Sequence, residues 1–220
     1  NDLSKRTSMF NVLNPDGTKM KIKKVINSTE SLRSFIQSIP SPKHLAVEAT
    51  RSWELLYDTT CDLVDEFSLG HPLKMKAISS ANIKNDKVDA ATIAQLAYTN
   101  FLPKVFIPSA EIRHLRSILR FRAFLVNQRR GLRNQIHALI DRNIWAGDKP
   151  KNFKDLFCKR GRLWLQALAL PDKERFILDE ALKIFDQLSS EILLIESVIT
   201  NYHADIPQLG LLRTVPGFRT

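Results

Sequence analysis

The stretch TSMFNVLNPDGTKMKIKKVI, residues 7–26, decides the class of fold. Two runs of alternating apolar and polar residues flank Asn14-Pro15-Asp16-Gly17, and turn residues between two such runs predict a β-hairpin. A hairpin supplies antiparallel strands, so a sheet that also holds later crossover strands must be mixed. The chain is therefore expected to begin with a mixed sheet.

The residues up to 97 alternate between helical and extended patterns. Helices are predicted for STESLRSFIQSI (28–39), WELLYDTTCDLVDEF (53–67) and IKNDKVDAATIAQLA (83–97). Strands are predicted for KHLAVEA (43–49) and LKMKAIS (73–79). The order hairpin, helix, strand, helix, strand, helix indicates an α/β fold.

The second half of the chain is predicted to be all-α. Residues 111–143 form one long helical pattern, and its single glycine, Gly131, costs about 1 kcal/mol without ending the helix. A break at 146–150 and a short helix within 153–168 follow. The last pattern, 171–205, has apolar residues that alternate by three and four, as in a coiled-coil seam: Leu178, Ala181, Phe185, Leu188, Ile192, Ile195, Ile199 and Tyr202.

The two long helices carry opposite charges, which favours an antiparallel hairpin between them. Residues 111–135 hold seven arginines and one acid, whereas residues 171–202 hold seven acids and three bases. On a helical wheel Arg122, Arg129 and Arg133 fall inside the apolar arc, where an arginine needs an acidic partner. We expect partners such as Glu180, Asp186 or Glu191.

Four other arginines are expected to meet nucleic-acid phosphates: Arg113, Arg116, Arg120 and Arg130. Residues 111–170 hold 14 Lys and Arg against 4 Asp and Glu, so this segment carries a net charge of +10. A concentrated basic segment in a protein of pI 9.8 is typical of a polyanion binder, and nucleic acid is the favoured polyanion. A solvated basic helix is the alternative interpretation.

Composition excludes several classes of protein. The chain has 220 residues, 44% of them hydrophobic, and no apolar run long enough to cross a membrane, so no membrane partner is expected. Its two cysteines suit a reducing cytoplasm, where we expect the protein to act. Phosphate-binding loops and nucleophile elbows are also missing from the sequence.

Four acids form the candidate catalytic and metal-binding site. Asp86 and Asp89 open the helix 83–97 on one face, Asp2 opens the first strand, and Glu48 closes the strand 43–49. If they converge, their repulsion requires divalent metal, and oxygen ligands select Mg²⁺ or Mn²⁺. Two such ions support phosphodiester cleavage or transfer. The alternative is that Asp86 and Asp89 only stabilise a helix start.

The chain resembles the DEDD-type transposases of the insertion-sequence family numbered one hundred and ten, which includes the Piv-type DNA invertases. The resemblance rests on DLSKRTS (2–8), LAVEAT (45–50), KNDKVDA (84–90) and TVPG (214–217), in that order. KNDKVDA is similar to the family's KTDxxDA, with Asn85 in place of the common Thr. Carried over residue by residue, the family's four metal-binding acids fall on the four acids named above.

The resemblance implies an architecture of three parts. Residues 1–108 would be a RuvC-like, RNase H-type catalytic domain, and residues 109–203 a helical coiled-coil region. Residues 204–220 would start a further transposase domain that supplies the family's nucleophilic serine, so this chain alone is expected to lack complete recombination activity. The family also implies DNA as substrate and a structured guide RNA, and we expect self-association.

Two other functions stay open on the sequence alone. The chain could be a stand-alone, RuvC-like, structure-specific nuclease, which would need no serine domain. It could also be a non-enzymatic nucleic-acid-binding module in which the acids only organise structure. Residues 50–52 (Thr-Arg-Ser) could contact a phosphate or cap a helix, and Trp53, Trp145 and Trp164 are expected in the core rather than stacked on bases.

Overall fold

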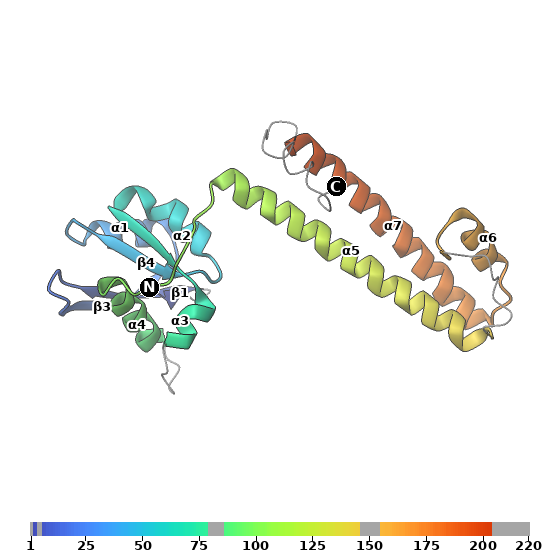
Figure 1. Ribbon diagram of the computed structural model, residues 1–220, viewed down its shortest axis with the longest axis horizontal. Helices are drawn as coiled ribbons and strands as arrows, with labels where there is room; N and C mark the ends of the chain where they lie inside the picture. The colour runs from blue at the N-terminus through green and yellow to red at the C-terminus, as the bar shows by residue number, and fades with distance from the viewer. Residues whose placement is uncertain (1, 4–5, 79–85, 146–154, 204–220) are drawn as a thin grey trace. The chain divides into compact units, whose positions relative to one another are not determined.

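The computed structural model divides the chain into two compact units, Asn1–Ile107 and Pro108–Thr220 (Figure 1). It describes residues 2–3, 6–78, 86–145 and 155–203. The first unit mixes strands and helices and the second is helical, so the expected change from α/β to all-α is confirmed.

The hairpin at 7–26 is present as predicted. Strands β2 (Thr7–Leu13) and β3 (Lys19–Ile26) pair antiparallel, with Thr7 opposite Ile26. The Asp16 carboxylate accepts a hydrogen bond from the Thr18 backbone N–H at 2.9 Å, which closes the turn locally. Gly17 sits at φ 82°, a left-handed conformation that glycine adopts without steric cost.

Two three-stranded sheets make up the rest of the β-structure. The first has the order β1-β2-β3, where β1 (Asp2–Leu3) pairs antiparallel with β2. The second has the order β4-β5-β6: β4 (His44–Glu48) and β5 (Glu66–Gly70) are parallel, and β6 (Lys104–Val105) is antiparallel to β5. The two sheets adjoin, because β1 lies against β4. The predicted mixture of strand directions is confirmed.

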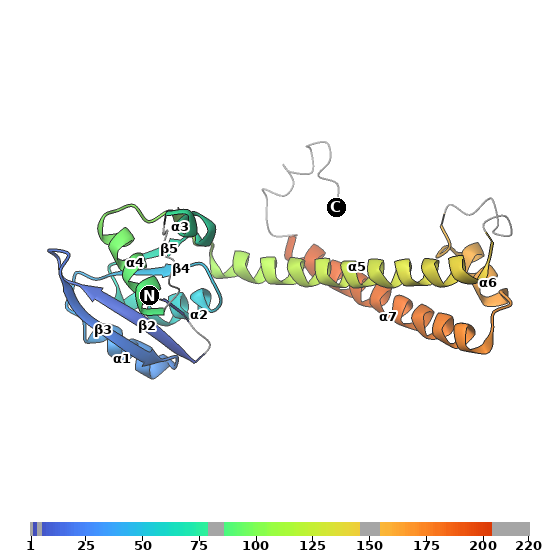
Figure 2. The ribbon, with the colours of Figure 1, turned by 90° about the horizontal axis from the view of Figure 1, so that it is seen from below.

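Helices cover the strands on two sides (Figure 2). Helices α1 (Thr29–Gln37) and α2 (Trp53–Thr60) and the 3₁₀ turn η1 (Cys61–Leu63) follow β3 and β4. The core beneath them contains Phe10, Val25, Leu32, Phe35, Ile36, Leu45, Val47, Leu56 and Leu69. Helices α3 (Pro72–Ile78) and α4 (Asp86–Tyr98) form a second core with β4, built from Ala46, Met75, Ile93 and Leu102.

The predicted strand at 73–79 is wrong, because these residues form helix α3. Its alternating pattern was misleading, since Met75 is the only buried residue of the helix and Pro72 occupies a first-turn position that suits proline. The second crossover strand is instead β5, whose first two residues, Glu66 and Phe67, lie in the stretch predicted as a helix. Ser68, Leu69 and Gly70 are buried in succession, and a strand covered on both faces shows no alternation of apolar and polar residues.

The second unit is dominated by two long antiparallel helices that lie side by side in both ribbon views, α5 (Ala110–Asn143) and α7 (Asp172–His203). Gly131 stays within α5, as expected. The predicted seam of α7 is buried or half-buried from Leu178 to Ile199 and faces away from solvent, while Tyr202 is exposed. The predicted break at 146–150 lies outside the described residues.

A short helix, α6 (Lys159–Ala167), closes one end of the pair. Its Leu165 is fully buried in a core with Ile136, Ile140 and Leu178. Beside this core the Phe157 ring stacks on Phe185, with ring centroids 4.3 Å apart. The apolar contacts of α6 thus join the end of α5 to the start of α7.

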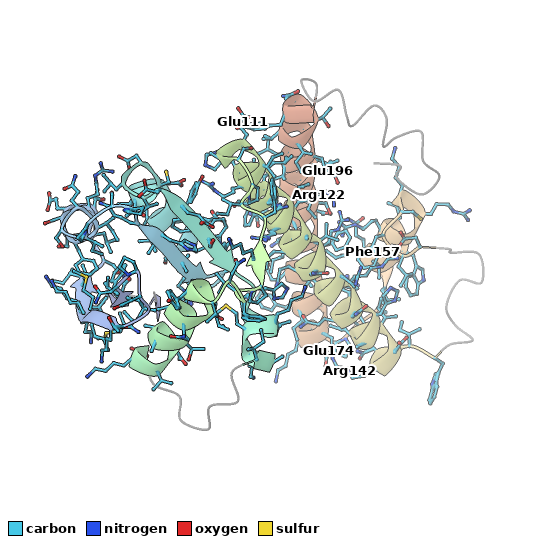
Figure 3. All side chains as sticks on the ribbon, turned by 60° about the vertical axis from the view of Figure 1, so that its left-hand side comes forward. Glu111, Arg122, Arg142, Phe157, Glu174 and Glu196 are labelled. Carbon is cyan, nitrogen blue, oxygen red and sulfur yellow. The ribbon has the colours of Figure 1, made fainter. Side chains whose placement is uncertain are left out.

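The three inner arginines of α5 bind within the protein, as expected, but their partners differ from those predicted. Arg122 donates to Glu196 of α7, with Nε 2.9 Å from Oε1 (Figure 3), and Arg133 donates to Asp155 at 2.9 Å. Arg129 lies over the Phe185 ring, with 5.9 Å between its guanidinium carbon and the ring centroid. Among the predicted partners, Asp186 pairs with Arg162 and Glu180 with Lys183.

None of the helices in the described part of the chain is long and apolar enough to cross a membrane.

Two glycines of the helical unit should respond in opposite ways to alanine. In Gly161→Ala the new Cβ would lie 2.3 Å from the Leu156 carbonyl oxygen, and backbone cannot yield as a side chain can, so we expect a loss of about 1–3 kcal/mol in unfolding free energy. In Gly131→Ala the Cβ meets nothing within 4 Å, so we expect a gain of up to about 1 kcal/mol. Denaturant unfolding measures both. Equal effects would contradict the described packing of α6.

Candidate metal centre and nucleic-acid surface

Strand alternation in β4 decides where Glu48 points. Leu45 and Val47 are buried in the core beneath α1 and α2, whereas Ala46 belongs to the core beneath α4. Because alternate side chains point to opposite faces of a strand, Glu48 shares the face of Ala46. Its register partner Gly70 confirms this direction, since a Cβ there would meet side-chain atoms of that same core.

Helix α4 turns its first acids toward the same side. Ala90 and Ile93 are the buried residues of α4, and Ile93 lies in the core that contains Ala46 of β4. Asp86 lies four residues before Ala90 and Asp89 four residues before Ile93, so both carboxylates continue the strand-facing stripe of the helix. Asp89 is half-buried and Asp86 is exposed, as expected where a helix runs past the edge of its core.

The backbone of β1 brings the fourth acid into this neighbourhood. Asp2 lies opposite Met9 in the β1–β2 pair. The β1 strand lies against both α4 and β4, the elements that carry the other three acids. Three segments far apart in the sequence, β1, β4 and α4, therefore lie against one another. The side chain of Asp2, like residues 84–85 of the KNDKVDA motif, lies outside the described part of the structure.

The donor atoms fit a hard divalent cation, because carboxylate oxygens are the ligands that Mg²⁺ and Mn²⁺ prefer. Among the side chains that the structure describes, however, no three His, Cys, Asp or Glu residues are grouped closely enough to hold a metal ion. Glu48, Asp86 and Asp89 therefore share a face without forming a complete coordination shell by themselves.

The loop after Glu48 has an unusual backbone that the sequence did not reveal. The Thr50 N–H donates to the Glu48 carbonyl at 2.7 Å, and Ser52 adopts φ 68°, a left-handed conformation that is uncommon for a residue other than glycine. The Ser52 side chain makes no capping hydrogen bond to α2. Capping therefore does not account for this serine, and residues 50–52 are exposed just after Glu48 in the chain.

The basic face of α5 differs from the expectation at one position. Arg113, one of the four arginines expected to meet phosphates, is only 6% exposed, and its guanidinium donates to the Pro108 carbonyl at 3.1 Å, so it does not lie on the solvent face of α5. The helical wheel could not show this, because the burial comes from the chain leading into the helix.

The other three predicted arginines do face solvent. Arg116, Arg120 and Arg130 are exposed and make no ion pair with another described residue. At 3.6 residues per turn they lie within an arc of about 80° on α5, opposite the stripe that contacts α7. A row of unpaired guanidinium groups is suited to phosphate oxygens, which accept bidentate hydrogen bonds from arginine.

The tryptophans divide between core and surface. Trp53 packs against the core beneath α1, and Trp164 packs against the core around Leu165, as expected. Trp145 is 84% exposed just after α5, so the expectation that it is buried is wrong. An exposed indole next to a basic helix is a surface on which a base can stack.

A polar network at the opposite ends of β4 and β5 was also missed by sequence reasoning. The Ser68 hydroxyl lies 2.8 Å from His44 Nε2 and 3.0 Å from Glu66 Oε1, and Lys104 donates to that same oxygen at 2.7 Å. Burial lowers the pKa of His44, and the hydrogen bond from Lys104 lowers the pKa of Glu66. His44 and Glu66 begin strands that end at Glu48 and Gly70, so this network is separate from the carboxylates.

The chain thus has a mixed α/β unit with a carboxylate at the end of strand β4, followed by a helical unit with an arginine face. Comparison with family models specifies its class. Residues 1–144 match the model of the DEDD transposases of IS110 elements, described as a transposase, and the chain belongs to that family. Its members cut and rejoin DNA, so DNA is the partner. Comparison with curated proteins gave no match.

Arg113 and Arg116 allow a direct test of the described α5 surface. Arg113→Ala removes a buried guanidinium and leaves the Pro108 carbonyl without that donor, so we expect a loss of about 1–3 kcal/mol in unfolding free energy. Arg116→Ala alters an exposed side chain and should change stability by less than about 0.5 kcal/mol. Chemical denaturation of both variants measures the difference. Equal losses would mean that the helix presents a different face.

Proposed function

We propose that this chain is the metal-dependent DNA-processing part of an IS110-type transposase, with a four-carboxylate site for Mg²⁺ or Mn²⁺. Asp2, Glu48, Asp86 and Asp89 would be its ligands. The observation that carries the proposal is that the strand-facing stripe of α4 begins with Asp86 and Asp89, on the face of β4 where Glu48 stands. A helix start alone would not need its acids to face a third carboxylate.

The topology supports a RuvC-like, RNase H-type fold for the first unit. If β1 and β4 belong to one layer, the strand order is β3-β2-β1-β4-β5, with an antiparallel meander followed by a parallel pair. Helices cover both faces of this layer. Asp2 would then stand on the central strand beside Glu48, and α4 would close the site from one face.

The metal would stabilise charge on the attacking and leaving oxygens of a phosphodiester when it is bound. The chain's own residues would bind and orient it. Glu48 is fixed by the alternation of β4, while Asp86 and Asp89 are fixed by the packing of Ala90 and Ile93. Without a cation the clustered carboxylates would repel one another, so metal binding and local stability should be coupled.

The helical unit would bind nucleic acid and other copies of the chain. Arg116, Arg120 and Arg130 would contact phosphates of DNA or of a structured guide RNA, and the α5–α7 pair would act as a coiled coil. Self-association is supported by an exposed apolar set on α7 that α5 does not cover: Ile177, Ile184, Leu193, Leu194 and Val198. A nucleophilic serine would come from a further domain, whose predicted start at 204–220 lies outside the described residues.

One observation favours a second function, a non-enzymatic nucleic-acid-binding module. The three described acids do not by themselves make a metal-binding group. In that case Asp86 and Asp89 would only stabilise the start of α4 through the helix dipole. A stand-alone RuvC-like nuclease has no observation of its own in its favour. The next experiment separates catalysis from the binding module.

Alanine at Asp86 or Asp89 should change the response to metal more than the stability without it. Without metal, removing one of several repelling carboxylates should keep the melting temperature level or raise it slightly. The stabilisation that Mg²⁺ adds should shrink, because binding to the native state supplies it. Melting curves with and without Mg²⁺ measure both effects, and Mg²⁺-dependent DNA processing should be lost in the full transposase.

Asp172 is a matched control, because it is a first-turn acid of α7 in the other unit. Asp172→Ala should lose at most about 1 kcal/mol and keep the Mg²⁺ response of the wild type. If Asp86→Ala and Asp89→Ala behave like this control, and the wild type does not respond to metal, the four-carboxylate site is refuted. The binding module is then the better description.

Replacing Arg116, Arg120 and Arg130 together with alanine should weaken nucleic-acid binding for all sequences. Each phosphate contact contributes about 0.7–0.9 to the slope of log K against log salt, so the slope should flatten by up to about 3. Fluorescence anisotropy with unrelated DNA and RNA probes, over a salt series, measures it. Lys173→Ala with Lys183→Ala removes two charges from α7 as a control, and an equal effect per charge removed would show that only net charge matters.

A further inference from the structure

Strand β3 carries a group of exposed lysines: Lys19, Lys21, Lys23 and Lys24. None of them forms an ion pair with another side chain in the described part of the chain. Because β3 is the outer strand of its sheet, lysines there also keep the open edge from pairing with other chains. Edge protection does not depend on which face of the sheet a lysine occupies, and Lys24 differs from its neighbour in that respect.

Strand alternation places Lys23 and Lys24 on opposite faces. Lys23 lies opposite Phe10, which is buried in the core beneath α1 and α2, and its Nζ lies 5.6 Å from the centroid of the Phe35 ring. Lys24 lies opposite Met9, the neighbour of Phe10 in β2, so it belongs to the other face. The helix on that face is α4, which lies against β2. Lys24 therefore shares a face with the candidate carboxylates.

The direction of α4 shows which of its ends lies near Lys24. A Cβ at Gly17, in the hairpin turn, would lie 2.7 Å from the Tyr98 ring, so the last residue of α4 lies at the turn. From Tyr98 back to Asp86 the helix spans about 18 Å. From Lys19 to Lys24 strand β3 spans about 17 Å. Lys24 therefore lies toward the start of α4 and away from the hairpin turn.

The register of the sheet relates Lys24 to the first candidate ligand. Lys24 lies opposite Met9, and Met9 lies opposite Asp2 on its other side. Neighbouring strands are about 4.8 Å apart, so the backbones of Lys24 and Asp2 are separated by about 10 Å. Ile26, the next residue of β3 on this face, is 65% exposed. The edge of the face around Lys24 is therefore open to a ligand.

We propose that Lys24 binds a backbone phosphate of the DNA strand that enters the carboxylate site. This inference rests on the proposed function, because it assigns a contact to the substrate of that site. Metal ions would neutralise the phosphate that reacts, but its neighbours would meet the negative potential of Glu48, Asp86 and Asp89. The Lys24 ammonium offsets that potential. A DNA strand has one phosphate per about 3.4 Å of helix axis, so Lys24 would contact one about three nucleotides from the reacting bond.

The test compares Lys24→Gln with Lys23→Gln, which removes the same charge from the other face. Fluorescence anisotropy measures binding of the 220-residue chain to labelled duplex DNA of arbitrary sequence, with Mg²⁺ and over a salt series. Lys24→Gln should weaken binding about three- to fivefold. It should flatten the slope of log K against log salt by about 0.9, because one phosphate contact is lost. Lys23→Gln should change both quantities by less than half as much, and Lys24→Arg should bind like the wild type because it keeps the charge.

Melting curves with and without Mg²⁺ separate this inference from the proposed metal site. Lys24→Gln should keep the Mg²⁺ stabilisation of the wild type, since Lys24 is not a metal ligand. If the wild type responds to Mg²⁺ but Lys24→Gln and Lys23→Gln bind DNA equally well, the inference alone is overturned. The same holds if Lys24→Gln weakens binding to an RNA duplex and not to DNA. If the wild type does not respond to Mg²⁺, the metal site is refuted and the inference with it.

Discussion

The alternation of side chains along β4 is the constraint on which the first unit depends. Leu45 and Val47 must enter the core beneath α1 and α2, and this leaves Ala46 and Glu48 to face α4. A shift of one residue would move the whole apolar set to the other face and bury a carboxylate among aliphatic side chains, which is costly without a partner. The same packing that stabilises the core therefore fixes the direction of the candidate ligand.

Helix α4 packs on the face of β4 that carries Ala46 and Glu48. Its buried residues are Ala90 and Ile93, and their spacing sets where the two aspartates lie on the helix. Gly70 has no side chain, and this leaves room for the core beneath α4. A Cβ at that position would collide with Met75 and crowd Leu102. Apolar packing therefore positions the elements that carry the candidate ligands, although the acids themselves lie at element ends.

In the helical unit, the arginines of α5 fall into two sets on opposite faces of the helix. Along one helix, α5 uses Arg122, Arg129 and Arg133 to bind acids, a hydroxyl and aromatic rings of its own unit. It leaves Arg116, Arg120 and Arg130 to solvent on the opposite face. Helical periodicity separates these two sets, so one segment can stabilise the fold and still present positive charge to a polyanion.

The sequence by itself determined the features that depend on local chemistry. Turn residues predicted the hairpin at Gly17, and helical periodicity predicted α1, α5 and α7. The motif residues indicated the transposase family, which the match to the family model over residues 1–144 confirms. Periodicity failed where burial is two-sided or comes from another segment. It placed a strand at α3 and extended a helix into the first two residues of β5, and it did not anticipate the buried Arg113 or the exposed Trp145. Only the tertiary structure decided that Glu48 and the aspartates of α4 share a face, because that relation depends on which core each neighbouring residue joins, and no local pattern contains this information.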